Sequence, residues 1–255
     1  MTTRIELENA VPIWGGIECT VRRLRDKYGD QIVRNGHHSR LSDLNLIAAL
    51  GIKTLRYPVI WEKIAPRGLR YADWSWVDER LNALVELGIN PIASLLHHGS
   101  GPEYTSLVDP DFPEKFTEFA IAVAQRYSWL ELFTPINEPL TTARFSCLYG
   151  VWYPHEHDDK KFSVAVLNQC KATVMAMREI KKINSNAKLV QTEDLGKCHA
   201  TRKMQYQADF ENQRRWISLD LLCGKLNENP VMMKYFREKG HIPDENLEYF
   251  NSNNF

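Results

Sequence analysis

The sequence has few cysteines, and none of them forms a paired motif. Five occur among 255 residues, scattered along the chain and without CxxC spacing. Secreted disulfide frameworks usually carry an even number of closely spaced cysteines, and structural zinc sites often use CxxC pairs. The cysteines therefore favour reduced thiols in a cytoplasmic protein.

An excess of charge and a long apolar run are also missing. Lys plus Arg and Asp plus Glu each total 32, so the formal net charge is zero. No basic face or tail indicates a nucleic-acid or anionic-membrane partner. No apolar run approaches the length of a membrane span, and the first residues lack the pattern of a secretory signal. We expect a cytoplasmic protein with no nucleic-acid or membrane partner.

Motifs for a bound cofactor or metal are weak. The only glycine-rich turn after a predicted strand is "WGGIE" (14–18), which lacks GxGxxG spacing. The segments "NGHHSR" (35–40) and "HEHDD" (155–159) are more typical of polar loops than of metal sites. We expect neither a cofactor nor a metal.

What the sequence does have is a regular alternation of strands and helices. Apolar strands are predicted at 11–18, 52–61, 89–98, 131–138 and 187–194, and helices at 42–51, 73–88, 112–127, 162–184, 204–224 and 231–240. Residues 22–31 are predicted to form a solvated loop. Buried strands that alternate with helices predict an α/β fold with a parallel sheet. This is either a doubly wound open sheet or a (β/α)8 TIM barrel.

Polar residues near the ends of the predicted strands favour the barrel. They are Glu18 on the first strand, Arg56 on the second, His97 and His98 on the third, Asn137 and Glu138 on the fourth and Glu193 on the fifth. Catalytic groups of TIM barrels lie at the carboxyl ends of several strands. Five β/α units extend to residue 240, whereas eight would need roughly 390 residues. We expect 1–255 to be the N-terminal portion of a single truncated barrel domain.

These residue types suit an uncharged ligand that is rich in hydroxyl groups. Aromatic side chains such as Trp152 could lie beneath the apolar face of a sugar, although core packing is the simpler role for any one of them. Hydrolysis of a glycosidic bond needs two carboxyl groups: one protonates the leaving oxygen, and the other attacks or activates water. Glu138 suits the acid, because neighbouring Ile136 and Pro139 favour a desolvated site that raises its pKa.

Four segments together resemble glycoside hydrolase family 1. "LFTPINEP" (132–139) is similar to its T-x-N-E-P motif, and "IWGGIE", "LRYPVIWEKIAPRG" and "INPIASLLHHGSGP" are similar to its first three strands, in the same order. The resemblance implies retaining hydrolysis of a β-glycosidic bond of a carbohydrate substrate. It implies that Glu138 is the general acid/base, Arg56 orients the nucleophile, Asn137 contacts the 2-hydroxyl and His97 binds the sugar.

The chain departs from the family pattern at several positions. Glu18 stands where the family has a sugar-binding Gln, and His98 replaces a Trp. We expect both to bind substrate, together with Glu193 and Trp152. The family's nucleophile is a Glu on strand seven, and these 255 residues contain no counterpart. Glu193 follows Thr192 as in the nucleophile motif but falls on the fifth strand, so we expect the nucleophile downstream.

Two alternatives remain. Similar barrels precede a reductase of the dTDP-4-dehydrorhamnose reductase type, which implies a covalently fused downstream domain as a partner. In that setting the chain would be a non-catalytic carbohydrate-binding barrel attached to a nucleotide-sugar enzyme. The third hypothesis is a misread gene fragment with no stable fold.

Overall fold

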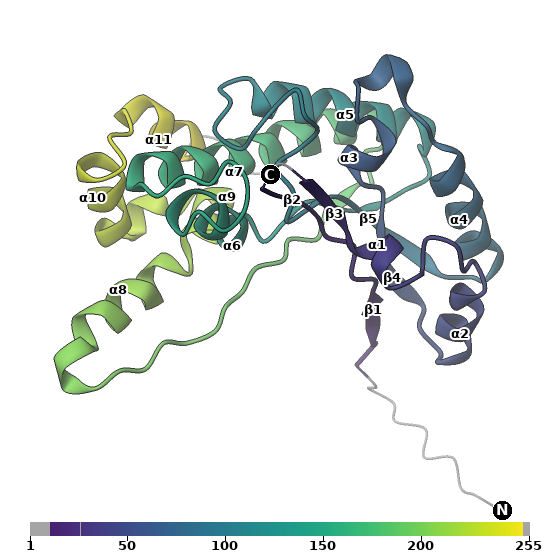
Figure 1. Cartoon of the computed structure of the whole chain (residues 1–255), viewed down its shortest axis with the longest axis horizontal. Helices are drawn as coiled ribbons and strands as arrows, with labels where there is room; N and C mark the ends of the chain where they lie inside the picture. Colours follow the sequence, from purple (N-terminus) through teal and green to yellow (C-terminus); the bar gives the residue numbers. More distant parts are fainter. Residues whose placement is uncertain (1–10, 26, 252–255) are drawn as a thin grey trace, which may run out of the picture.

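The computed structural model describes residues 11–25 and 27–251, and its centre is a parallel sheet of five strands (Figure 1). These are β1 (Trp14–Gly16), β4 (Thr54–Pro58), β5 (Asn90–His97), β6 (Leu132–Asn137) and β7 (Lys188–Leu189). Their order in the sheet is β1-β4-β5-β6-β7, which follows the chain without reversal. A doubly wound sheet reverses its strand order at a switch point. The order therefore matches part of a barrel, as predicted.

Helices between the strands cover one face of the sheet, and further helices follow β7. The α-helices are α1 (Gln31–Arg34), α2 (Asp43–Ala49), α3 (Trp61–Ile64), α4 (Ser75–Glu86), α5 (Phe112–Arg126), α6 (Pro139–Ala143), α7 (Asp159–Ile183), α8 (Gln205–Arg214), α9 (Ile217–Leu222), α10 (Pro230–Glu238) and α11 (Asp244–Asn251). Shorter turns are η1 (Leu69–Tyr71), η2 (Arg144–Leu148, a π-helix), η3 (Arg202–Met204) and η4 (Leu226–Glu228). Right-handed crossovers in a sheet whose order never reverses place the connecting helices on the same face.

A buried aromatic cluster joins this helical layer to the sheet. Phe112, Phe116 and Phe119 of α5 are fully buried, and so are Phe133 of β6 and Phe162 of α7. Burying a large apolar side chain contributes about 1.5–3 kcal/mol, so this layer is a major source of stability. It fixes β5 and β6, whose carboxyl ends carry the candidate site.

The segment after β1 differs from the prediction. Residues 22–31 were expected to be a solvated loop, but this stretch contains most of an antiparallel hairpin of β2 (Val21–Leu24) and β3 (Lys27–Asp30) and the first residue of α1. The prediction is wrong because charged residues in this hairpin also pack. Arg23 lies over the Tyr153 ring at 3.8 Å, and Val21 is buried in a small second core with Ile32 and Ile60.

The fifth predicted strand is shorter than expected. Strand β7 ends at Leu189, and no regular structure follows until η3, although the chain stays beside β6 for three more residues. Val190 N–H donates to Phe133 O at 2.8 Å, and Glu138 N–H donates to Thr192 O at 3.2 Å. Beyond this point the chain leaves the sheet and leads to α8, which lies apart from the other helices (Figure 1).

The predicted helix 204–224 is also divided, into α8 and α9. In the described part of the chain, no helix has both the length and the apolar character that a membrane crossing requires.

Candidate functional site

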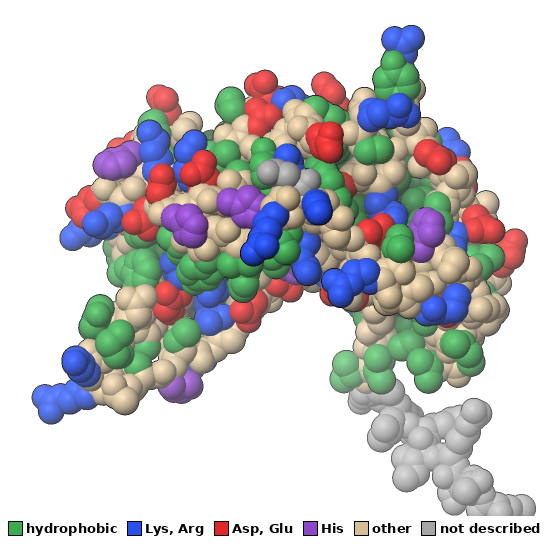
Figure 2. All heavy atoms as spheres, viewed as in Figure 1, with side chains coloured by type: hydrophobic (Ala, Val, Ile, Leu, Met, Phe, Trp, Pro, Cys, Tyr) green, Lys and Arg blue, Asp and Glu red, His purple; other side chains and the backbone are tan. Residues whose placement is uncertain are grey.

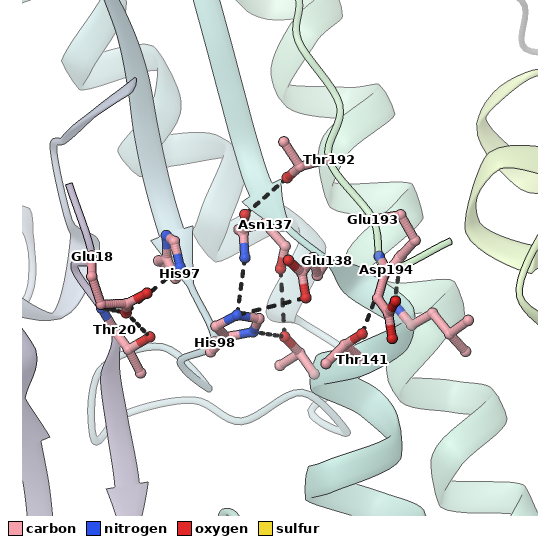
Figure 3. Close-up of polar contacts among 12 residues, drawn as sticks. Glu18, Thr20, His97, His98, Asn137, Glu138, Thr141, Thr192, Glu193 and Asp194 are labelled. Carbon is pink, nitrogen blue, oxygen red and sulfur yellow. Dashed lines mark hydrogen bonds and ion pairs between the residues drawn. The ribbon is translucent and has the colours of Figure 1, made fainter. Parts of the chain in front are cut away.

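The candidate site is built on two equivalent positions of neighbouring strands. Strands β5 and β6 pair in register up to His97 and Asn137, their last residues. The next residue in each case adopts a left-handed backbone, with φ of 56° at His98 and 46° at Glu138. This conformation is costly for residues with a Cβ atom, and such strain is concentrated at functional sites. It directs both side chains into one region, where His98 Nε2 lies 3.8 Å from Glu138 Oε2 (Figure 3).

Glu138 is half-buried, with 28% of its side chain exposed. Burial raises the pKa of its carboxyl group, and the nearby carboxylate of Asp194 raises it further, while Arg56 opposes both. The desolvation expected from the sequence is thus present at this residue. A raised pKa favours the proton-donor role of a carboxyl group.

Asn137 is fully buried and organises its neighbours. Its Oδ1 accepts hydrogen bonds from Arg56 and from the Thr192 hydroxyl, the latter at 2.8 Å. Its Nδ2 lies 3.1 Å from His98 Nε2 and donates to it. The two acceptor bonds fix the orientation of the amide. Arg56 therefore contacts Asn137 and Thr192, and no carboxylate among the described residues forms an ion pair with it.

His98 is held as a neutral imidazole. Because its Nε2 accepts from Asn137, its Nδ1 carries the proton and donates to the Thr142 hydroxyl at 3.0 Å. Burial lowers the pKa of His98 to about 4. At neutral pH the contact between His98 and Glu138 is therefore not an ion pair.

His97 is also buried and neutral. Burial, with smaller contributions from His98 and Arg56, lowers its pKa to about 3. Its Nδ1 lies 3.2 Å from the Cys19 thiol, whose pKa is raised by burial so that the sulfur keeps its proton. The thiol donates to Nδ1, and the Nε2–H of His97 is directed toward Glu18 Oε1 at 3.9 Å.

Glu18 is the open carboxylate of the site, with 54% of its side chain exposed. Burial acts to raise its pKa, but hydrogen bonds from the Thr20 hydroxyl at 2.6 Å and the Thr20 amide at 3.0 Å prevail and lower it. The pKa shifts of Glu18 and Glu138 therefore have opposite directions. Figure 3 shows Glu18 and His97 on one side of His98, and Glu138 on the other.

Trp152 forms an aromatic wall beside these groups. Its ring centroid lies 5.4 Å from that of His98, and it stacks on Phe145 at 4.8 Å. A partly buried indole next to imidazole, amide and carboxyl groups is suited to the apolar face of a sugar ring.

Glu193 has a different surrounding from the one expected. Its two oxygens accept from the Ser218 hydroxyl at 2.6 Å, Leu140 N–H at 3.0 Å, Asp194 N–H at 3.2 Å and the Thr141 hydroxyl at 3.4 Å. A carboxylate has about four acceptor positions, so the protein's own donors fill them. Its carboxylate joins the start of α6 to α9, and its role in substrate binding stays a prediction.

Sequence reasoning missed the supporting residues. Thr192 orients Asn137, Thr142 sets the tautomer of His98 and Cys19 sets that of His97. Thr192 lay within a predicted strand, one residue before Glu193, so its position was available as a signal. The Cys19 contact joins residues 78 positions apart, and no local pattern indicates it.

Similarity to known proteins identifies the family to which the chain belongs. The family model described as "Glycosyl hydrolase family 1" matches residues 10–250 of the chain. The chain belongs to glycosyl hydrolase family 1. The resemblance noted in the sequence is thus confirmed at the level of the family.

Individual relatives are distant. A "Probable inactive beta-glucosidase 14" of Oryza sativa subsp. japonica is 23% identical over 141 residues, which is 51% of this chain and 27% of that protein. A "Coniferin beta-glucosidase" of Pinus contorta is 21% identical over 149 residues, covering 55% of this chain and 29% of that protein. The chain thus matches less than a third of the length of these relatives.

Solved structures share the fold over a longer stretch. A family 1 β-glucosidase from Thermotoga maritima, in complex with isofagomine lactam, aligns with a TM-score of 0.73 at 19% identity, over 84% of this chain and 52% of that one. The AHE enzyme from Alicyclobacillus herbarius aligns with a TM-score of 0.72 at 20% identity, over 84% and 52%. The parallel sheet therefore corresponds to part of the family's barrel.

Proposed function

We propose that the chain carries the acid/base part of a retaining β-glycosidase site, with Glu138 as the proton donor. The observation that carries the proposal is the half-buried carboxyl group of Glu138, which lies 3.8 Å from the neutral His98 imidazole and whose pKa is raised by burial. A carboxyl group whose pKa is raised in this way is suited to donate a proton.

The surrounding groups support a sugar as the ligand. The neutral imidazoles of His97 and His98 and the ionised Glu18 can donate to and accept from sugar hydroxyls, and Trp152 offers an aromatic face. Protonation of the glycosidic oxygen by Glu138 would let the leaving group depart as an alcohol, and the resulting carboxylate would then activate water. No metal or organic cofactor enters this route.

The second carboxylate is the open part of the proposal. In the family, Arg56 is expected to orient a nucleophilic Glu, but here it contacts Asn137 and Thr192. We propose that the nucleophile comes from polypeptide outside these 255 residues. The second candidate is a non-catalytic carbohydrate-binding barrel attached to a nucleotide-sugar enzyme. The contacts of Arg56 with Asn137 and Thr192 support it equally, because such a barrel needs no nucleophile for Arg56 to orient.

A panel of aryl β-glycosides tests the proposal. Hydrolysis is measured for the unchanged protein, for Glu138→Gln and for Glu131→Gln, which makes the same change at the exposed, opposite end of β6. Loss of hydrolysis in Glu138→Gln alone supports the acid role. Sugar binding by calorimetry that is equal in all three proteins, with no hydrolysis in any, would leave the binding barrel. The assay is run on the 255-residue chain and on the longest polypeptide that its gene encodes.

A further inference from the structure

A second group of side chains lies beside the candidate site and takes no part in it. A groove of about 720 Å³ lies between the β2–β3 hairpin and the loop 150–155. Its lining residues are Arg22, Leu24, Arg25, Lys27, Tyr28, Gly29, Arg34, Gly150, Val151 and His155. Its volume lies within the range of small-molecule sites, about 300–1,000 Å³. Figure 2 shows Lys and Arg side chains gathered over this hairpin, near the centre of the view.

The Lys and Arg side chains among the described lining residues have no acidic neighbour in that lining. They are Arg22, Arg25, Lys27 and Arg34. Among the described residues, these four side chains form no ion pair, whereas Asp30 at the end of β3 is already paired with Lys63. The whole protein carries no net charge, so this concentration of positive charge is local. Neighbouring cations repel one another, and a bound anion relieves that repulsion.

The pairing of the hairpin places two of the cations on one face. Arg22 pairs with Gly29 and Leu24 pairs with Lys27, so these four residues share a face of the ribbon. Gly29 brings no side chain, and this leaves room beside Arg22. Arginine presents planar, multiple donors to phosphate oxygens, and lysine adds a point charge.

The walls of the groove are fixed to each other by His155. Its Nε2 accepts from Arg25 N–H at 3.2 Å, so its Nδ1 carries the proton and donates to Gly150 O at 3.0 Å. Tyr153 N–H also donates to Arg23 O at 3.0 Å. The Arg25–His155 and Tyr153–Arg23 bonds join the hairpin to the loop, so the two segments that line the groove are held together before any ligand arrives.

The same loop connects the groove to the sugar site. Gly150, Val151 and His155 line the groove, and Trp152, between them in sequence, faces His98. We propose that the groove binds a phosphate group, carried by a ligand that reaches it past Trp152 or present as a free anion. Phosphate binding itself does not depend on Glu138 being catalytic. Only placement of the phosphate on the sugar ligand rests on the proposed function.

Calorimetric titration with inorganic pyrophosphate and inorganic phosphate tests the site. The variant Arg22→Gln/Lys27→Gln removes two charges from the groove, and Lys53→Gln/Lys188→Gln removes two exposed charges at the amino ends of β4 and β7. We expect saturable binding that the groove variant weakens by more than about tenfold and the control leaves unchanged, because charge-assisted bonds are lost. Unsaturable binding, or equal weakening in both variants, would overturn the proposal.

A second variant keeps all four cationic side chains and separates a loss of binding from a loss of folding. A Cβ atom at Gly29 would meet only Arg22 O, at 3.8 Å, so Gly29→Asp fits the backbone. Its carboxylate would compete for Arg22, and pyrophosphate binding should fall while the circular dichroism spectrum stays unchanged. Retained binding in folded Gly29→Asp would contradict the groove as the site.

The source of the phosphate is tested with glucose 1-phosphate and glucose 6-phosphate. Binding of either that is tighter than that of inorganic phosphate, and that Trp152→Ala weakens, supports a phosphate on the sugar ligand. Equal binding of all three, unaffected by Trp152→Ala, supports a free-anion site. Either result stands independently of hydrolysis, so failure of the Glu138 proposal is recognised separately.

Discussion

Glu138 and Glu193 follow neighbouring strands of one sheet, and burial raises the pKa of both, yet their surroundings differ. Glu193 receives four hydrogen bonds from α6, α9 and its own loop, whereas Glu138 has a half-buried carboxyl group beside His98. A position at the carboxyl end of a barrel strand therefore does not by itself leave a carboxylate available to a ligand. The number of protein donors already facing a carboxylate separates a structural group from one available to a ligand.

The largest expected effect concerns the leaving group. If Glu138 is the proton donor, Glu138→Gln lowers kcat/KM by about 10²–10⁴-fold for aryl glycosides with poor leaving groups. Dinitrophenyl glycosides need no protonation, so their bond cleavage should change far less. A plot of rate against leaving-group pKa measures this difference, and an equal loss for all substrates would remove Glu138 from the acid role.

Substitution of Glu193, the other carboxylate, should lower the stability of the protein. Glu193→Ala removes the acceptor for two backbone N–H groups and two hydroxyls, which we expect to cost about 3 kcal/mol of unfolding free energy. In a chain of this size each kcal/mol lowers Tm by about 2–4 °C. Thermal unfolding measures the shift, with exposed Glu131→Ala as the control. A Tm equal to that of the unchanged protein would contradict the structural role.

The carboxyl group of Glu62 extends the comparison to the pH dependence of stability. Glu62 is buried, its Oε1 accepts from Gly101 N–H at 3.1 Å, and burial raises its pKa to about 8. The folded state then binds more protons than the unfolded state above pH 4.5, so stability falls as pH rises toward 8.

His97 and His98 act in the opposite direction, because their folded pKa values of about 3 and 4 make stability rise up to pH 6.5. Between pH 6.5 and 8 the Glu62 contribution therefore dominates among these groups. We expect the unfolding free energy to fall by about 1–2 kcal/mol across that interval, and Glu62→Gln to remove most of the fall. Urea unfolding at several pH values measures both slopes, and identical slopes would refute the assignment.

The smallest effect is expected at the aromatic wall. Trp152→Ala should weaken sugar binding by about tenfold, because one stacking face is lost. Trp129 lies before β6, far along the strand from the site, and is 44% exposed, so Trp129→Ala is the matched control. Calorimetry with a β-glycoside measures both, and equal affinity in the two variants would exclude Trp152 as a platform.

The sequence predicted those parts of the fold that local patterns determine. Buried strands such as 89–98 alternate with amphipathic helices, and this was enough for a parallel sheet with the correct strand order. The β2–β3 hairpin was missed because Arg23 packs through a ring contact with distant Tyr153. Strand β7 was predicted too long, because Val190 and Thr192 remain beside β6 without continuing the ladder.

The site was predicted less completely than the fold. Glu138, Asn137, Arg56, His98 and Trp152 come together as the strand ends suggested, with His97 and Glu18 beside them. Their roles in binding and catalysis stay predictions. The donors around Glu193 come from α6 and α9, and contacts between elements so far apart in sequence leave no periodic signal. Local patterns locate a carboxylate, but only tertiary contacts show whether it is free.

The left-handed backbone of Glu138 has a consequence for laboratory evolution. A residue with a Cβ atom at φ 46° costs about 1–2 kcal/mol, and glycine there avoids that cost. Selection for thermal resistance alone would therefore tolerate or enrich Glu138→Gly, and so discard the proposed proton donor. Libraries of this protein should be screened for turnover and heat tolerance together, because selection for turnover favours Glu at position 138 and selection for heat tolerance favours Gly.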